Sequence, residues 1–202
     1  PFPQVSVSCG EHPLHQQDVL DAELLLKLAA DPKVVAVGET GLDYYRTEES
    51  QAAAQHVSFR AHIDIAREVG KPVIIHDRDA HKDVIETLET YGAPETVVFH
   101  CFSGDAEMAK VCAQAGWYMS IPGVVTFKNA QQLRDAVLEI PDHLLLVETD
   151  SPFLTPAPNR GQANSSANIP WTVRAICEVR GQSEQEICEL LFSNAARVFG
   201  PF

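Results

Sequence analysis

The chain has 202 residues, of which 45% are hydrophobic and 21% are charged, and this composition is ordinary for a globular protein. Its formal net charge of −13 excludes proteins that wrap nucleic acid over a broadly basic surface, but it leaves open an enzyme that holds DNA through a few local contacts. No apolar stretch approaches the roughly 20 residues that a membrane-spanning helix requires. The five cysteines form no Cys-x-x-Cys pair, so we expect reduced thiols in a cytoplasmic protein.

Short apolar runs alternate with helix-like stretches along the chain, which is the pattern of a parallel α/β fold. The expected strands span residues 4–8, 34–37, 73–75, 97–99, 117–121 and 144–147. The expected helices span residues 22–30, 49–69, 80–91, 106–115, 130–137, 169–180 and 184–192, and residues 151–168 are expected to form a long loop. The sequence therefore predicts six βα units in a single domain, residues 1–202.

Four of these apolar runs stop at a residue that can bind a metal, namely Glu39, His76, His100 and Asp150. In parallel α/β folds the active site forms where the carboxyl ends of the strands converge. Two imidazoles and two carboxylates at that face predict a divalent-metal hydrolase. Because nearly every strand ends in a polar group, the pattern favours a (β/α)8-type barrel with two units absent over an open doubly wound sheet, whose ligands would cluster at one switch point.

Several sequence blocks resemble the signature motifs of TatD-type metal-dependent deoxyribonucleases. These blocks are residues 38–44 (Gly-Glu-Thr-Gly-Leu-Asp-Tyr), 75–80, 100–104, 123–130, 148–152 (Glu-Thr-Asp-Ser-Pro), 160–161 and 194–196. They occur in the order of the family and run nearly from end to end of the chain, so together they are specific.

The resemblance implies a TIM barrel of the amidohydrolase type that cleaves DNA phosphodiester bonds from DNA ends, with two divalent metal ions (Mg, Zn or Mn). It implies that Glu39 bridges the two metals and that His76 and His100 complete one site. It also implies that Asp150 belongs to the other site and activates the attacking water. Such proteins usually open with a His-x-His strand, and no counterpart occurs here, so we expect the first two βα units to be absent and the stronger surviving site to be formed by Glu39, His76 and His100.

Four further residues are expected to contact substrate. Arg78, Lys128 and Arg160 follow strands or lie in loops at the expected active face, where a guanidinium or ammonium group can hold a phosphate. An ion pair with an adjacent aspartate is the alternative for Arg78. His12, in the turn Gly-Glu-His-Pro, either orients a phosphate or only completes that turn.

The expected ligands also have structural interpretations. Glu39 is alternatively the ion-pair partner of Arg46 or Arg78, and Asp150 is alternatively the cap of the turn before Pro152. Two rival functions stay open: a metal-dependent amidase or lactonase on the same barrel, and an inactive, truncated barrel that lacks the His-x-His pair. The remaining histidines are expected to be structural or to lie at the surface, namely His15, His56, His62, His81 and His143.

Overall fold

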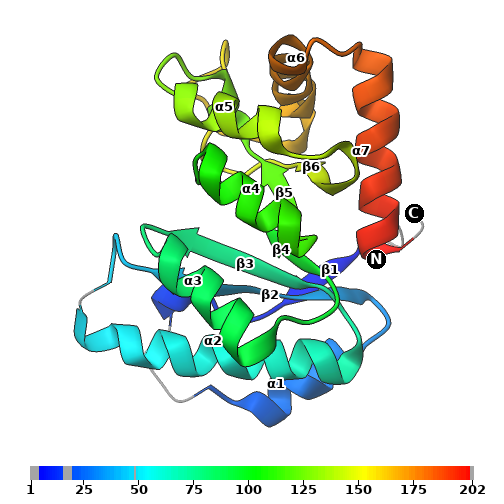
Figure 1. Ribbon diagram of the computed structural model, residues 1–202. Helices are drawn as coiled ribbons and strands as arrows, with labels where there is room; N and C mark the ends of the chain where they lie inside the picture. Colours follow the sequence, from blue (N-terminus) through cyan, green and yellow to red (C-terminus); the bar gives the residue numbers. More distant parts are fainter. Residues whose placement is uncertain (1–4, 16–19, 48, 201–202) are drawn as a thin grey trace. The chain divides into compact units, whose positions relative to one another are not determined.

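The computed structural model describes residues 5–15, 20–47 and 49–200, and within these ranges strands and helices alternate as the sequence predicts. The strands are β1 (Val7–Cys9), β2 (Val34–Asp43), β3 (Val73–Arg78), β4 (Val97–Phe99), β5 (Tyr118–Ile121) and β6 (Leu145–Val147). The helices are α1 (Ala22–Ala29), α2 (Glu49–Val69), α3 (His81–Thr87), α4 (Ala106–Ala115), α5 (Gln131–Glu139), α6 (Ile169–Arg180) and α7 (Glu184–Phe199). Strand order follows chain order, β1-β2-β3-β4-β5-β6 (Figure 1).

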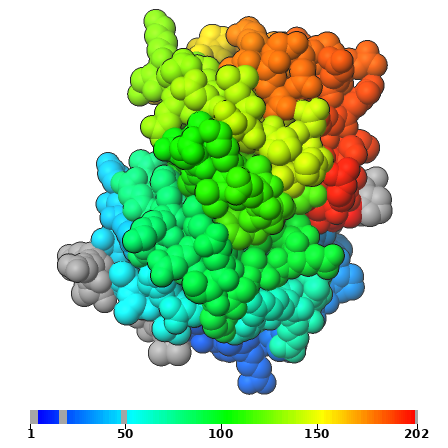
Figure 2. All heavy atoms as spheres, viewed as in Figure 1, coloured from blue at the N-terminus to red at the C-terminus, as the bar shows by residue number. Residues whose placement is uncertain are grey.

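The chain divides into two compact units, Pro1–Val98 with Val198–Phe202, and Phe99–Arg197. In the first unit, β1 pairs with β2 and β2 pairs with β3, both in parallel. Helix α2 packs on β2 and buries Phe59, Ile63 and Ala66, whose spacing of four and three residues places them on one face of the helix. On the face shown in Figure 2, the cyan and turquoise side chains of α2 and of the segment after it form much of the surface of this unit.

Strand β2 is longer than the sequence predicts, because it continues past Glu39 to Asp43. Its second half keeps a parallel register with β3, in which Gly41 pairs with His76, after a register shift between Val37 and Thr40. A Cβ atom on Gly41 would lie 2.1 Å from the His76 carbonyl oxygen, so only glycine permits this close approach. Glu39 and His76 therefore lie inside their strands, and the expectation that both strands stop at these residues is wrong.

The second unit contains the parallel pair β5–β6 and the helices that follow. Helix α4 begins at Asp105, whose side chain accepts a hydrogen bond from the Met108 N–H, as a typical N-cap does. The Asn194 amide donates to the carbonyl oxygens of Asp142 and Leu145, and so ties α7 to the start of β6. Helix α7 extends to Phe199, seven residues beyond the expected end.

Two other expectations from composition can be compared with the structure. All five cysteines are free thiols. A search of the helices in the described ranges finds none that combines the length and apolarity needed to cross a membrane.

Candidate metal centre

Three side chains of the first unit converge on one point: His12, Glu39 and His76. The His76 Nδ1 atom lies 2.9 Å from Glu39 Oε2. The His12 Nε2 atom lies 3.4 Å from the same oxygen and 3.2 Å from His76 Nδ1. All three residues are partly exposed, so the cluster is open to solvent and to ligands.

These separations match those of atoms that share a metal ion. Ligands bound tetrahedrally at 2.0–2.1 Å lie about 3.3 Å from one another, close to the three distances in the cluster. Two nitrogens and one carboxylate oxygen also suit a divalent transition metal or zinc. The donor set and its geometry therefore fit a divalent cation.

Behind His76, a buried carboxylate fixes the far side of the ring. Asp43 is 2% exposed, and its Oδ2 atom lies 3.0 Å from His76 Nε2. Its Oδ1 atom accepts the backbone N–H groups of Tyr45 and Arg46 at 3.0 and 2.8 Å. The Gln55 amide oxygen accepts the backbone N–H of Asp43 at 3.0 Å. Hydrogen bonds on both oxygens thus hold the carboxylate in place.

Behind His12, the support comes from backbone and from a buried histidine. The Leu14 N–H donates to His12 Nδ1 at 3.1 Å. The Glu11 N–H donates to Nε2 of His62, and the Nδ1 atom of His62 lies 2.7 Å from the Ser58 carbonyl oxygen. Burial lowers the pKa of His62 below its ordinary value of 6.5, an effect that the hydrogen bond to the Ser58 backbone opposes. The expectation that His62 is structural is confirmed, since it anchors the turn that carries His12.

In the second unit, His100 directly follows β4 and its Nδ1 atom lies 3.2 Å from Glu148 Oε1. Both side chains are largely buried, with 18% and 16% exposed. Asp150 lies three residues after β6, is half-buried, and accepts the Phe153 N–H at its backbone carbonyl. Thus His100 and Asp150 both follow strand ends, as the sequence predicts, and their assignment as metal ligands stays a prediction.

The three expected phosphate contacts are exposed cationic side chains. The Arg78 guanidinium stacks on the Tyr45 ring, 4.8 Å from its centroid, and no ion pair involves Arg78 within the ranges that the structure describes. The Arg160 guanidinium lies 3.9 Å from the Phe127 ring centroid. Lys128 is exposed on the loop that follows Phe127. Stacking on an aromatic ring leaves the edge of a guanidinium free to donate to a phosphate.

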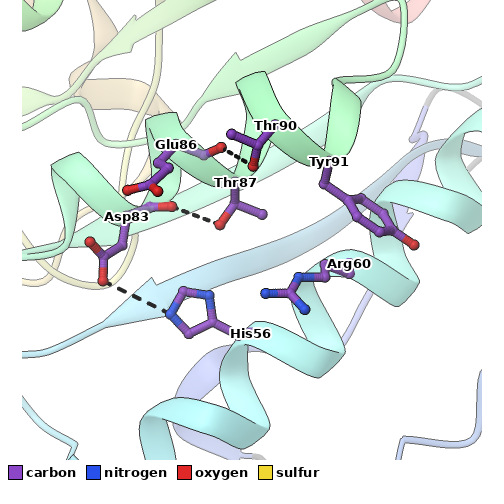
Figure 3. A pocket seen from close by; sticks show the side chains of 7 residues that line it. All are labelled: His56, Arg60, Asp83, Glu86, Thr87, Thr90 and Tyr91. Atoms are coloured by element: carbon purple, nitrogen blue, oxygen red, sulfur yellow. Dashed lines mark hydrogen bonds and ion pairs between the residues drawn. The ribbon is translucent and has the colours of Figure 1, made fainter.

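A separate hollow of about 350 Å³ lies between α2 and α3 of the first unit, lined by His56, Arg60, Asp83, Glu86, Thr87, Thr90 and Tyr91 (Figure 3). The polar side chains around this hollow already bind one another or a neighbouring residue. The Tyr44 hydroxyl donates to Asp83 at 2.7 Å and lies 2.9 Å from His56 Nε2. Burial, followed by the hydrogen bond to Asp83, raises the pKa of Tyr44. Among the described residues, this hollow has no group of donors at metal-binding distance, unlike the cluster at Glu39.

Sequence reasoning missed two carboxylates that contact the expected ligands. Asp43 lies in the motif of residues 38–44 but was given no role. Glu148 directly follows the apolar residues of β6, so its position carried the same signal as that of Asp150. The placement of His12 at the centre of the cluster was also not expected, although the residue was selected as functional.

Comparisons with known proteins agree with the resemblance to TatD-type proteins. The family described as "TatD related DNase" matches residues 1–200. A Mycobacterium tuberculosis protein named "Uncharacterized metal-dependent hydrolase TatD" is 46% identical over 203 residues, which cover 98% of this chain and 77% of that protein.

Two solved structures resemble the chain. The crystal structure of YjjV, a TatD homologue from Escherichia coli, has a TM-score of 0.92 and 29% sequence identity, and the match covers 100% of this chain and 79% of that one. An uncharacterized amidohydrolase from Saccharomyces cerevisiae has a TM-score of 0.77 and 16% identity over 96% of this chain and 80% of its own, and so shows the fold alone. The predicted fold class, an α/β fold of the TIM-barrel type with six parallel strands present, is confirmed.

Proposed function

Because the chain belongs to the family of TatD-related DNases, whose relatives bear the name of metal-dependent hydrolases, we propose that it is a metal-dependent hydrolase that cleaves DNA phosphodiester bonds. The observation that carries this proposal is the convergence of His12, Glu39 and His76 within 3.4 Å of one another. Arg78, an exposed cation, follows His76 by two residues on β3. A metal centre next to a phosphate-binding cation is what hydrolysis of a polyanion requires.

In this proposal Glu39 and His76 hold a divalent metal ion, and His100 and Asp150 keep the ligand roles that the family motifs assign to them. A bound divalent ion polarises a phosphoryl oxygen and lowers the pKa of a neighbouring water. Asp150 accepts the proton of the attacking water. His12, Arg78, Lys128 and Arg160 hold the phosphates of the strand by charge and hydrogen bonding.

The proposed reaction is the removal of nucleotides from a DNA end, with water as the nucleophile. The metal is Mg, Mn or Zn. We place the protein in the cytoplasm, because its five free thiols suit a reducing compartment. The net charge of −13 implies that attraction to DNA runs through a few exposed cations.

An end-labelled single-stranded oligonucleotide tests the proposal. The full-length protein, stripped of metal with a chelator and then given Mg²⁺, Mn²⁺ or Zn²⁺, should shorten the oligonucleotide only after metal is returned. Glu39→Gln should abolish the cleavage, whereas Glu68→Gln, an exposed site on α2, should not. An oligonucleotide left intact under every metal, together with turnover of a neutral lactone or amide, would replace the nuclease by the amidase or lactonase alternative.

A further inference from the structure

The two imidazoles of the cluster differ in the group that binds the nitrogen facing away from Glu39. For His76 this nitrogen is Nε2, which lies 3.0 Å from a carboxylate oxygen of Asp43. For His12 it is Nδ1, which accepts the backbone N–H of Leu14 at 3.1 Å. A carboxylate can only accept a hydrogen bond, and a backbone N–H can only donate one. Consequently the outer nitrogen of His76 carries a proton, and that of His12 does not.

We infer that Asp43 and the Leu14 N–H fix the proton positions of the two histidines. Nδ1 of His76, which the family motifs already assign to a metal site, then presents a lone pair to the metal, whereas Nε2 of His12 presents an N–H group and is not a third ligand. A neutral imidazole has one N–H group. With its proton on Nε2, His76 presents a lone pair at Nδ1. With Nδ1 occupied as an acceptor, His12 carries its proton on Nε2, the atom that faces the cluster. The inference rests on the proposed metal centre, and it reduces the three candidate ligands of the cluster to two, Glu39 and His76.

The distances within the cluster agree with this division. His76 Nδ1 and Glu39 Oε2 are both acceptors and lie 2.9 Å apart, a separation that two ligands of one metal ion can have. His12 Nε2 lies farther from Glu39 Oε2, at 3.4 Å. The N–H at that position faces His76 Nδ1 at 3.2 Å and Glu39 Oε2 at 3.4 Å, and it can donate to a phosphoryl oxygen of the substrate when a metal ion takes those two atoms. This donor role is the one by which His12 would orient a phosphate.

Asp43 is the positioning residue in this arrangement, because it sets the proton of His76. A carboxylate that hydrogen-bonds the far nitrogen of a metal-bound imidazole fixes the tautomer and the ring orientation. Asp43 cannot turn away, since its Oδ1 atom already accepts the N–H groups of Tyr45 and Arg46. The same two N–H groups would fix the orientation of an amide group at this position.

In Asp43→Asn, the amide oxygen has to stay with the N–H groups of Tyr45 and Arg46, so the NH₂ group meets His76 Nε2. The ring then carries its proton on Nδ1, opposite Glu39, where it opposes metal binding. We expect the affinity for Zn²⁺ to fall by about 10–100-fold, the usual cost of losing such a carboxylate partner. Asp77→Asn is the matched control, because Asp77 Oδ2 lies 2.7 Å from His81 Nδ1 and Asp77 is not part of the cluster. It should bind Zn²⁺ as the parent does.

Competition with a chromophoric chelator measures these affinities, and two further variants separate ligand from donor. His76→Ala should lose most of the Zn²⁺ affinity, while His12→Ala should stay close to the parent. An equal loss in His12→Ala and His76→Ala would overturn the division of roles. Unchanged affinity in Asp43→Asn would remove the positioning role of Asp43. If Glu39→Gln also binds Zn²⁺ like the parent, the proposed metal centre itself is wrong, so the two failures are distinguishable.

Nitrogen-15 NMR of the histidine rings in the Zn²⁺-loaded parent gives a test that needs no variant to fold. The expected spectrum shows a proton on Nε2 and a coordinated Nδ1 for His76, and a proton on Nε2 with an unprotonated, uncoordinated Nδ1 for His12. Coordination of Zn²⁺ by the Nε2 atom of His12 would overturn the inference.

Discussion

Replacing Arg78 by alanine should weaken the binding of single-stranded DNA and make it less sensitive to salt. Arg78 is exposed, stacks on Tyr45 and has no ion pair among the described residues, so its full charge is available to one phosphate. Each phosphate contact on a single strand contributes about 0.7 to the slope of log affinity against log salt concentration. Losing one contact should therefore flatten the slope by about 0.7. Between 50 and 200 mM salt, the parent should lose about 2.6-fold more affinity than the variant.

Fluorescence anisotropy of a labelled oligonucleotide over a salt series measures both slopes. Arg67→Ala is the control, because it removes the same charge from a guanidinium already bound to Asp64 at 3.2 Å and to the Tyr91 carbonyl at 2.9 Å. Arg67→Ala should keep the slope of the parent. Equal slopes in the parent and in Arg78→Ala would refute the assignment of Arg78 as a phosphate contact, and a parent without salt dependence would refute DNA as the ligand.

Three further predictions concern chemistry, packing and pH. Asp150→Asn should keep metal binding but lower the DNase rate by about 10²–10⁴-fold, as expected for a lost proton acceptor, and a rate close to the parent in a single-turnover assay would contradict this role. Gly41→Ala should lower both the melting temperature and the Zn²⁺ affinity more than Gly70→Ala does, because a Cβ at Gly41 meets the His76 carbonyl oxygen at 2.1 Å, whereas Gly70 also has a positive φ but open space around it. His62 has a pKa lowered by burial, so its contribution to stability is present above pH 6.5 and is lost as the pH falls below that value. Urea unfolding at pH 7.5 and 5.5 should therefore show a decrease in the free energy of unfolding that is smaller in His62→Gln.

The secondary structure was largely predictable because buried parallel strands are short apolar runs and the helices end at Gly or Pro. The prediction placed α2 at residues 49–69 and α6 at residues 169–180, as observed. It ended β2 too early, because Gly38 and Glu39 interrupt the apolar run while the backbone pairing with β3 continues. The apolar pattern of one segment contains no information about its pairing with another strand.

Part of the site was also predictable. Glu39 and His76 were selected because each follows a buried apolar run, and the structure places them 2.9 Å apart. The roles of Asp43 and Glu148 were not predictable, because they depend on which atom of a neighbouring histidine each carboxylate reaches. His12 was selected as functional, but its contacts with Glu39 and His76 were not predicted, because they join residues that are far apart in the sequence.

The central claim is that the protein hydrolyses DNA phosphodiester bonds with a divalent metal held by Glu39. Incubation of the metal-loaded, full-length protein with an oligonucleotide in water enriched in oxygen-18, followed by mass spectrometry of the released nucleotides, tests it most directly. The account predicts one oxygen-18 atom in the phosphate of each released nucleotide, and no released nucleotide with a chelator or in Glu39→Gln. Unlabelled nucleotides, or release that persists in Glu39→Gln, would contradict it.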